Sequence, residues 1–300
     1  MTQRIGFLGL GVMGTAITER LIEAGFAVQG WNRTAERARA LEARGVSVFG
    51  SAREAAAGAE VCCLCLTDAS AVRDVLLGPD GARQTLKHGA LVIDFSTIGV
   101  AAAQSLARDL AREGIDYIDA PVSGGPGAAR AGELAIMWGG ESTGGVRAQP
   151  VFAALARRAT HIGASGAGQA AKLCNQLIVS SNLIAISEAI SFARALGIDA
   201  KVLPAALAGG YADSLPLQIY GSRMTETMNQ QRLSRTATML KDVREIMNTA
   251  SGLPINLRLA KMALTLYQEA ADSGWGEDDL DVLPRLSAHG DQSVTKGQNT

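Results

Sequence analysis

The first half of the chain alternates between short apolar runs and amphipathic stretches of helical periodicity. The apolar runs lie at residues 4–10, 27–32, 61–67, 90–97 and 116–122. Uninterrupted apolar strands that alternate with helices are typical of a parallel sheet covered on both faces. The pattern therefore predicts an α/β fold with an N-terminal Rossmann domain, a doubly wound parallel sheet.

A long helix is predicted next, from about Gln169 to Leu196, because this stretch lacks proline and glycine and is followed by Gly197. Between Ala159 and Ser187 its only formally charged side chain is Lys172. Since the helix is apolar on most of its circumference, we expect it to be mostly buried. A buried lysine needs a partner, so Lys172 should face a cleft or an anion. The alternative is a lysine that reaches solvent or ties down a loop.

The rest of the chain is predicted to be helical, with breaks near residues 209–210, 216, 252–254 and 274. A length of 300 residues suggests two domains. We place a dinucleotide-binding Rossmann domain at 1–164 and an all-helical domain for substrate binding and oligomerisation at 165–300. Residues 290–300 are polar without periodicity, and we expect them to pack poorly.

A glycine-rich turn joins the first predicted strand to the first predicted helix. It reads Gly9-Leu10-Gly11-Val12-Met13-Gly14, and a second strand follows the helix. In this strand–turn–helix–strand context, G-x-G-x-x-G is the dinucleotide fingerprint rather than an ordinary glycine-rich turn. The first glycine permits the turn, the second lets the backbone approach the pyrophosphate, and the third allows close packing of helix and strand.

The end of the second strand predicts which cofactor is preferred. NAD sites usually place an acidic residue there to bind the ribose 2′-hydroxyl, whereas this chain has Asn32-Arg33-Thr34. Asn32 removes a carboxylate that would repel a 2′-phosphate, and Arg33 supplies a cation, with Arg37 one turn further on. The sequence therefore favours NADP over NAD. The alternative is that Arg33 is only a solvated surface residue.

Polar residues end three of the later strands: Thr67-Asp68, the segment 94–97, and Asp119 followed by Ser123-Gly124-Gly125. Because ligands bind beyond the carboxyl ends of parallel strands, all three segments should line one crevice. Two glycines after a serine expose backbone N–H groups, which suits a small carboxylate. The alternative for the Ser-Gly-Gly segment is a plain turn.

Composition excludes several functional classes. The 28 basic and 29 acidic residues give a net charge of −1, so affinity for nucleic acid or anionic membranes is not expected. No apolar run free of polar groups reaches the roughly 18 residues of a membrane span, and a strand begins at Arg4, which leaves no room for a signal peptide. The spacing of the four cysteines matches no metal or redox motif, so we expect small core residues. These features favour a soluble cytoplasmic protein without a metal.

With these residues in view, the chain resembles the β-hydroxyacid dehydrogenase family, of the 3-hydroxyisobutyrate dehydrogenase and tartronate semialdehyde reductase kind. The resemblance covers about residues 4–286 and rests on motifs in the family's order. These motifs are FLGLGVMG, DFST, DAPVSGG, GAGQAAKLCN and LKDV. It implies an N-terminal Rossmann domain, the long helix between domains, and a helical C-terminal domain that helps to form an oligomer, a homodimer or homotetramer.

The resemblance also implies roles for individual residues. Lys172 would be the catalytic acid or base, and Asn175 would bind substrate, with Gln176 beside it. The substrate carboxylate would be held by Ser123, Gly124 and Gly125. Leu66, Thr67, Thr97 and Lys241 would join the glycine motif and the Asn32-Arg33-Thr34 segment at the cofactor, and Asp242 would hold Lys241.

Some positions depart from the family pattern. Val100 replaces a usual proline, Ile17 a common methionine, and Trp138 a small aliphatic residue. Ser234 stands where many members place a phenylalanine over the substrate. Because the cofactor and catalytic motifs are intact, these departures affect the expected substrate rather than the reaction type.

Three functions compete at this point. The first is an NADP-dependent enzyme that interconverts small β-hydroxyacids and aldehyde-acids by hydride transfer. The second is an imine or other carbonyl reductase on the same scaffold, a class that usually carries another residue at the position of Lys172. The third is a non-catalytic NADP-binding protein, which the intact Lys172, Asn175 and Ser-Gly-Gly segment disfavour.

Overall fold

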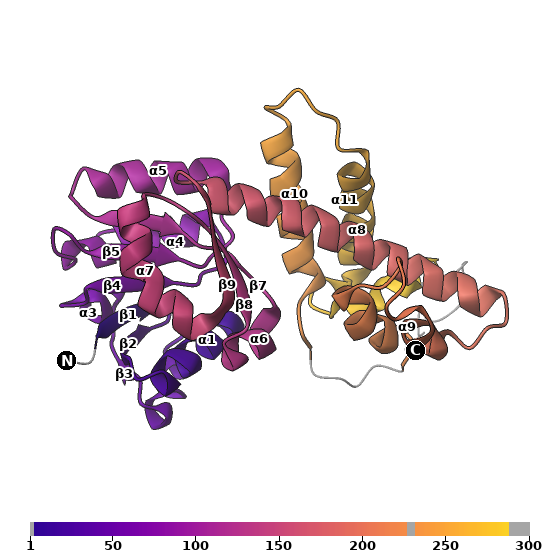
Figure 1. Ribbon diagram of the computed structural model, residues 1–300, viewed down its shortest axis with the longest axis horizontal. Helices are drawn as coiled ribbons and strands as arrows, with labels where there is room; N and C mark the ends of the chain where they lie inside the picture. Colours follow the sequence, from indigo (N-terminus) through magenta and orange to yellow (C-terminus); the bar gives the residue numbers. More distant parts are fainter. Residues whose placement is uncertain (1–2, 227–231, 288–300) are drawn as a thin grey trace, which may run out of the picture. The chain divides into compact units, whose positions relative to one another are not determined.

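The computed structural model describes residues 3–226 and 232–287 of the chain (Figure 1). It divides into two compact units, Met1–Leu173 and Cys174–Thr300. The division falls inside one helix, α8 (Ala167–Ala195). A division by sequence at residue 165 instead assigns this whole helix to the second domain.

The first unit is built on one twisted sheet with the order β3-β2-β1-β4-β5-β6-β8-β7, and β9 pairs with β8. The strands from β3 to β6 are all parallel, which confirms the predicted Rossmann sheet. Their bounds are β1 (Arg4–Leu8), β2 (Ala27–Trp31), β3 (Ser47–Val48), β4 (Val61–Leu64), β5 (Leu91–Asp94) and β6 (Asp116–Asp119). Leu64, Asp94 and Asp119 stand in register across the last three, so these strand ends meet at one edge.

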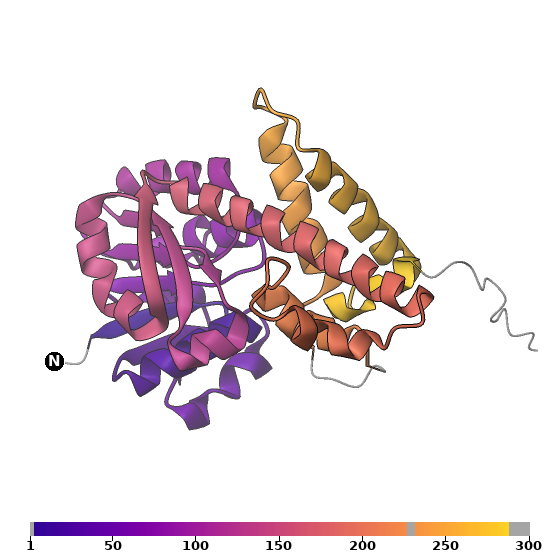
Figure 2. The ribbon, with the colours of Figure 1, turned by 45° about the vertical axis from the view of Figure 1, so that its right-hand side comes forward.

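The far side of the sheet departs from the parallel pattern. There β8 (Leu134–Gly139) runs antiparallel to both β6 and β7 (Val122–Ser123), while β9 (Ala156–Gly163) runs parallel to β8. Figure 2 shows the two long strands, β8 and β9, side by side. The sequence pattern did not identify β9, because five of its eight residues are exposed and it lacks a continuous apolar run.

Helices cover both faces of this sheet (Figure 1). Two apolar clusters, centred on Phe7 and Phe152 and on Leu8 and Leu76, fill the space between the sheet and the helices. The helices of this unit are α1 (Val12–Glu23), α2 (Ala35–Arg39), α3 (Ala52–Ala56), α4 (Ala69–Leu77), α5 (Val100–Ala111), α6 (Gly125–Ala131) and α7 (Ser142–Leu155). The first strand ends at Leu8 rather than at the predicted Leu10, because Gly9 turns the chain with a φ of 101°.

The second unit is helical, as predicted. It contains the rest of α8, α9 (Leu203–Leu207), α10 (Thr236–Ala250) and α11 (Arg258–Ala270), with irregular helical turns at Leu217–Gly221, Ala271–Trp275 and Leu280–Ser287. Leu183, Ile186 and Ile190 of α8 pack with Val243 and Tyr267 in one apolar core. The predicted stop at Gly197 is confirmed by its left-handed φ of 75°. The prediction for residues 290–300 lies outside the described residues.

The prediction that α8 is mostly buried is wrong for its part in the second unit. Ile178 is 69% exposed and Phe192 66% exposed, and Cys174 on the same helix is exposed as well. Within the single chain, the apolar circumference of the helix is therefore only partly covered. By length and composition α8 could cross a membrane, but we assign it as a core helix because Leu183, Ile186 and Ile190 pack inside the second unit.

Candidate functional site

The three glycines of the fingerprint have the geometry that the sequence predicts. Gly9 has a φ of 101°, and a Cβ atom on Gly14 would lie 1.9 Å from the Gly9 carbonyl oxygen. Gly11 precedes α1, and a Cβ atom there would meet nothing within 4 Å. No side chain caps the start of α1, and the position that a Gly11 Cβ atom would take is open. A helix N-terminus with free space suits a phosphate group, and these residues therefore fit a dinucleotide. Val12 and Met13 occupy the first turn of α1.

Asn32 ties the end of β2 to the glycine turn. Its Oδ1 accepts a hydrogen bond from the Leu10 amide at 2.9 Å, and its Nδ2 donates to the Thr34 carbonyl at 3.0 Å. Arg33 and Arg37 are exposed. An uncharged side chain is thus fixed where many Rossmann sites have a carboxylate, with two exposed cations next to it.

The segments that follow β4 and β5 are joined through Ser96. The Ser96 hydroxyl accepts from the Leu66 amide at 2.9 Å, and the Ser96 amide donates to Asp94 Oδ1 at the same distance. Thr67 donates to Asp68, which caps α4 by accepting from the Ala71 amide. Within the first unit, the structure therefore brings Leu66 and Thr67 close to the segment that carries Thr97.

Asp94 and Asp119 are fully buried at the strand ends, where each accepts hydrogen bonds from backbone amides. Asp94 accepts a hydrogen bond from Tyr117 at 2.9 Å, and burial raises the pKa of the Asp94 carboxyl against the opposing effect of its hydrogen bonds. Burial also raises the pKa of Asp119, to about 6, although two backbone amides favour its charged form. The sequence located both residues at the crevice but did not indicate that they point inward.

Lys172 is 8% exposed, so it is buried within the first unit. That it faces a cleft or an anion stays a prediction. Its Nζ donates to the Val122 carbonyl oxygen at 2.8 Å, at the end of the segment that follows β6. Ser123 is the next residue and is half-buried. Gly124 and Gly125 have φ values of 129° and 72°, and they start α6. The structure therefore places the lysine next to the Ser-Gly-Gly segment.

A chain of polar contacts in the second unit joins the other predicted residues. The Asn175 amide donates to Gln176 Oε1 at 2.8 Å, and Gln176 Nε2 donates to Asp242 Oδ2 at 2.5 Å. Asp242 Oδ1 lies 3.1 Å from Lys241 Nζ, which is the ion pair that the resemblance implies. Gln176 and Asp242 are buried. The bond between them was not anticipated, because it connects α8 with α10 across a long stretch of sequence.

The departures from the family pattern lie in several places. Trp138 stacks on His161 with ring centroids 3.9 Å apart and packs over Gly145 of α7, so it is accommodated by the fold of the first unit. Ile17 is fully buried in the core. The Ser234 amide donates to Asp279 Oδ1 at 3.2 Å in the second unit.

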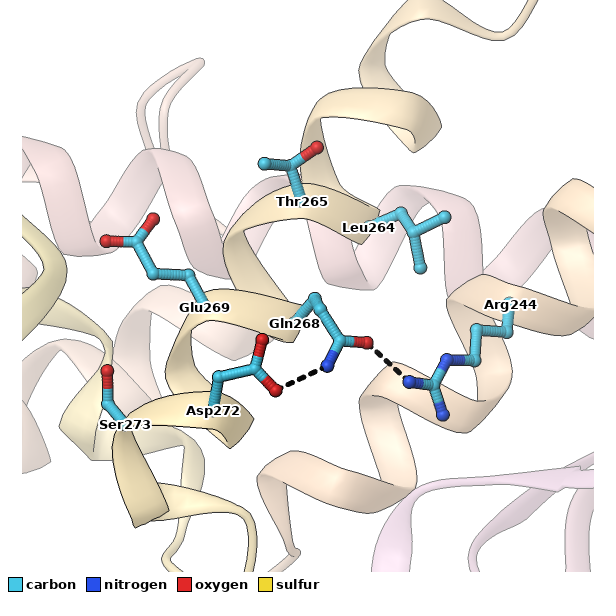
Figure 3. A pocket seen from close by; sticks show the side chains of 7 residues that line it. All are labelled: Arg244, Leu264, Thr265, Gln268, Glu269, Asp272 and Ser273. Atoms are coloured by element: carbon cyan, nitrogen blue, oxygen red, sulfur yellow. Dashed lines mark hydrogen bonds between the residues drawn. The ribbon is translucent and has the colours of Figure 1, made fainter.

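A surface pocket of about 640 Å³ lies between α10 and α11 and contains none of the predicted site residues (Figure 3). Arg244 of α10 donates to Gln268, which in turn donates to Asp272 at 2.7 Å. Because Arg244, Gln268 and Asp272 bond to one another, we assign no ligand to this pocket. Within the ranges 3–226 and 232–287, no group of three or more His, Cys, Asp or Glu side chains could hold a metal ion.

Both parts of the chain match known families. Residues 4–163 match the NAD binding domain of 6-phosphogluconate dehydrogenase. Residues 166–286 match the family described as NAD-binding of NADP-dependent 3-hydroxyisobutyrate dehydrogenase.

Similar proteins include 2-hydroxy-3-oxopropionate reductase of Escherichia coli, 34% identical over 93% of this chain and 95% of that protein. NAD-dependent L-serine dehydrogenase of Pseudomonas aeruginosa is 31% identical over 95% of this chain and 97% of its own length. The structure of Mycobacterium tuberculosis 3-hydroxyisobutyrate dehydrogenase with L-serine is 32% identical, with a TM-score of 0.83 over 96% of this chain and 99% of that chain. The glycine motif, the Rossmann sheet and these similarities together place the chain in the β-hydroxyacid dehydrogenase family, as an NAD(P)-dependent oxidoreductase that acts on hydroxyl groups.

Proposed function

We propose that this enzyme interconverts small β-hydroxyacids and their aldehyde-acids, with NADPH preferred over NADH and Lys172 as the general acid and base. The observation that carries the proposal is the position of Lys172. It is the one buried lysine among the described residues, and its Nζ lies at the Val122 carbonyl, directly before the Ser-Gly-Gly segment.

The reaction assigns a separate task to each group. When bound, the nicotinamide cofactor supplies the hydride for the aldehyde carbon. The Lys172 ammonium gives a proton from Nζ to the carbonyl oxygen, which becomes the hydroxyl, and in the oxidation direction the neutral amine takes that proton back. The Val122 carbonyl orients Nζ in the structure at 2.8 Å. A positioned acid of this kind removes the need for a proton from bulk water.

We assign the substrate carboxylate to Ser123, Gly124 and Gly125. Left-handed φ values at both glycines turn the chain at the start of α6, which leaves backbone N–H groups without neighbouring Cβ atoms. A Cβ atom at Gly124 would lie 2.7 Å from the Ala128 Cβ, whereas one at Gly125 would meet nothing within 4 Å. Open space at Gly125 supports a ligand site there.

In the second unit we assign Asn175 and Gln176 to substrate binding and Lys241 to the nicotinamide end of the cofactor. The supporting observation is the polar chain from Asn175 through Gln176 and Asp242 to Lys241. Such a chain fixes the orientation of two amide side chains that otherwise rotate freely. For the cofactor preference, the support is the uncharged Asn32 and the exposed Arg33.

We also propose a homodimer or homotetramer formed through the second unit. The exposed side chains of Ile178, Phe192 and Leu196 lie on or just after α8 and are 69%, 66% and 60% exposed. Several large apolar side chains exposed along one helix are typical of a protein interface.

A substrate panel with both cofactors tests the proposal. We would follow nicotinamide absorbance with four substrates. The aldehyde-acid 2-hydroxy-3-oxopropionate and a cyclic imine would be reduced with NADPH or NADH, and 3-hydroxyisobutyrate and L-serine would be oxidised with NADP or NAD. We expect turnover of a small β-hydroxyacid or aldehyde-acid, with the higher kcat/KM for the NADP form. Turnover of the imine alone would contradict the substrate class, and preference for NAD would contradict the role of Asn32 and Arg33.

A further inference from the structure

The first turn of α8 is attached to the end of β6 by a buried carboxylate. Asp119 Oδ1 accepts from the Gly166 amide at 2.7 Å, and Oδ2 accepts from the Gln169 amide at 2.8 Å. Asp119 is 0% exposed. Since the first amides of a helix have no partner inside the helix, this side chain satisfies two of them and fixes where α8 begins.

The Gln169 side chain attaches the same turn to the segment after β5. Its Oε1 accepts from the Ile98 amide at 3.1 Å, and its Nε2 donates to the Ser96 carbonyl at 2.8 Å. Gln169 is also 0% exposed. Both ends of the amide group are thus engaged with the backbone on either side of Thr97.

The backbone packs closely around the Asp119 carboxylate. A Cβ atom on Gly168 would lie 2.6 Å from the carbonyl oxygens of Asp119 and Met137. One on Gly139 would lie 2.8 Å from Asp119 Oδ1. Backbone therefore approaches backbone around the carboxylate, and a displacement of α8 would break both of its hydrogen bonds.

Lys172 stands one turn after Gln169, and its Nζ bonds to Val122, three residues after Asp119. The segment 119–122 therefore bonds to the first turn of α8 through Asp119 and to the Lys172 ammonium through Val122. We propose that Asp119 and Gln169 are positioning residues that set the place of Lys172 Nζ relative to the Ser-Gly-Gly segment. The proposal rests on the proposed function of Lys172 as general acid and base.

The expected effects follow from the sensitivity of catalysis to geometry, where about 1 Å of misplacement can cost about 100-fold. Gln169→Met keeps the volume but loses both side-chain hydrogen bonds, and we expect kcat to fall roughly 10- to 100-fold. The KM for NADPH should change less than kcat, because the glycine turn is untouched and the side-chain hydrogen bonds of Gln169 go to the backbone beside Thr97. Asp119→Asn keeps one good acceptor for the two amides and should show a smaller fall in the same direction.

A double-mutant cycle separates positioning from general destabilisation. We would measure kcat and KM with 2-hydroxy-3-oxopropionate and NADPH for Gln169→Met, Lys172→Ala and the double variant, together with their thermal midpoints. If Gln169 acts through Lys172, Gln169→Met should lower kcat little further in the Lys172→Ala background. Ser180→Ala is the matched control, since Ser180 is also buried on α8 but its hydroxyl bonds only to Leu177 of the same helix.

Each outcome decides between the two proposals. If Lys172→Ala loses kcat while Gln169→Met and Asp119→Asn keep it, the positioning role is wrong and the catalytic role of Lys172 stands. If the losses multiply in the double variant, Gln169 acts independently of Lys172 and the positioning role is again wrong. If Lys172→Ala itself keeps its kcat, the proposed function of the lysine fails. If Gln169→Met does not fold, the cycle with Asp119→Asn gives the same decision.

Discussion

The two units differ in where they place polar and apolar side chains. In the first unit, carboxylates and amides are buried at the strand ends, and each makes specific hydrogen bonds. Among its described residues, only Val12, Val146 and Ile162 are large, apolar and exposed. The second unit exposes many such side chains, among them Ile178, Phe192 and Tyr211. The difference indicates that the first unit covers nearly all of its large apolar side chains by itself, whereas the second leaves an apolar surface exposed.

The comparison has a direct consequence for mutations. Changes at the buried polar groups of the first unit should lower kcat or alter the pH dependence of stability, and they should leave assembly intact. Changes on the apolar surface of the second unit should alter assembly first.

The largest expected effect is that of Lys172→Ala. Since general acid–base catalysis contributes about 10²–10⁴-fold, kcat should fall by roughly two to four decades, or about 3–5 kcal/mol of barrier. The fold and NADPH binding should persist, and Lys172→Arg should not restore turnover because a guanidinium stays protonated. Steady-state kinetics and a thermal midpoint would be measured beside Lys87→Ala, an exposed lysine of the same unit. A variant that keeps its kcat but loses stability would make Lys172 a structural residue.

The next effect concerns Asp119, whose pKa is raised by burial to about 6 from 3.8. The folded state then binds more protons than the unfolded state between about pH 4 and pH 6, so stability falls as the pH rises through that window. The full change is on the order of 3 kcal/mol. Urea midpoints across this range should show a steeper decline for the wild type than for Asp119→Asn, which does not titrate. Parallel curves for the two proteins would contradict the raised pKa.

Asp213 gives the opposite sign in the second unit. Its pKa is lowered by the hydrogen bond from the Gly209 amide, so its contribution is present above the ordinary value and is lost as the pH falls through the lowered one. In the same series of urea midpoints, the wild type should lose stability at acid pH, below the ordinary aspartate pKa of 3.8, and Asp213→Asn should lose less.

A smaller effect is expected at the exposed apolar surface. Burying a phenylalanine contributes about 1.5–3 kcal/mol, so Phe192→Glu should weaken self-association roughly 10- to 100-fold. Sedimentation velocity at micromolar concentration would measure this change. Val146→Glu is the control, because Val146 is 76% exposed but lies in the first unit. A monomeric wild type would contradict the proposed assembly. Equal effects of Phe192→Glu and Val146→Glu on self-association would contradict the difference between the units.

The smallest effect is expected at the cofactor. Removing one exposed cation that pairs with a 2′-phosphate should cost about 1 kcal/mol, so Arg33→Ala should reduce the NADPH preference roughly fivefold to tenfold. The ratio of kcat/KM for NADPH and NADH is the measurement. Arg39→Ala, also exposed at the end of α2, should leave the ratio unchanged. A ratio that Arg33→Ala does not alter would show that Arg33 is only a solvated surface residue.

Local sequence determined much of this protein. Gly9, Gly11 and Gly14 are recognisable by their spacing, since the backbone angle of Gly9 and the close contact of Gly14 with Gly9 admit only glycine. The continuous apolar strands indicate a parallel sheet. Lys172 was identifiable because a lone charge on an apolar helix requires a partner. These features depend on residues close together in the chain, so they can be predicted from the sequence pattern.

Tertiary structure decided the rest. The sequence placed Asp119 at a strand end and did not single out Gln169, and only the folded chain shows that their hydrogen bonds attach α8 to the strand ends. The link from Gln176 to Asp242 joins residues far apart in the sequence. The same apolar composition of α8 gives buried positions at Leu183 and Ile190 and exposed ones at Ile178 and Phe192. Periodicity shows that a helix is apolar, but which of its faces is covered depends on packing partners that the pattern does not contain.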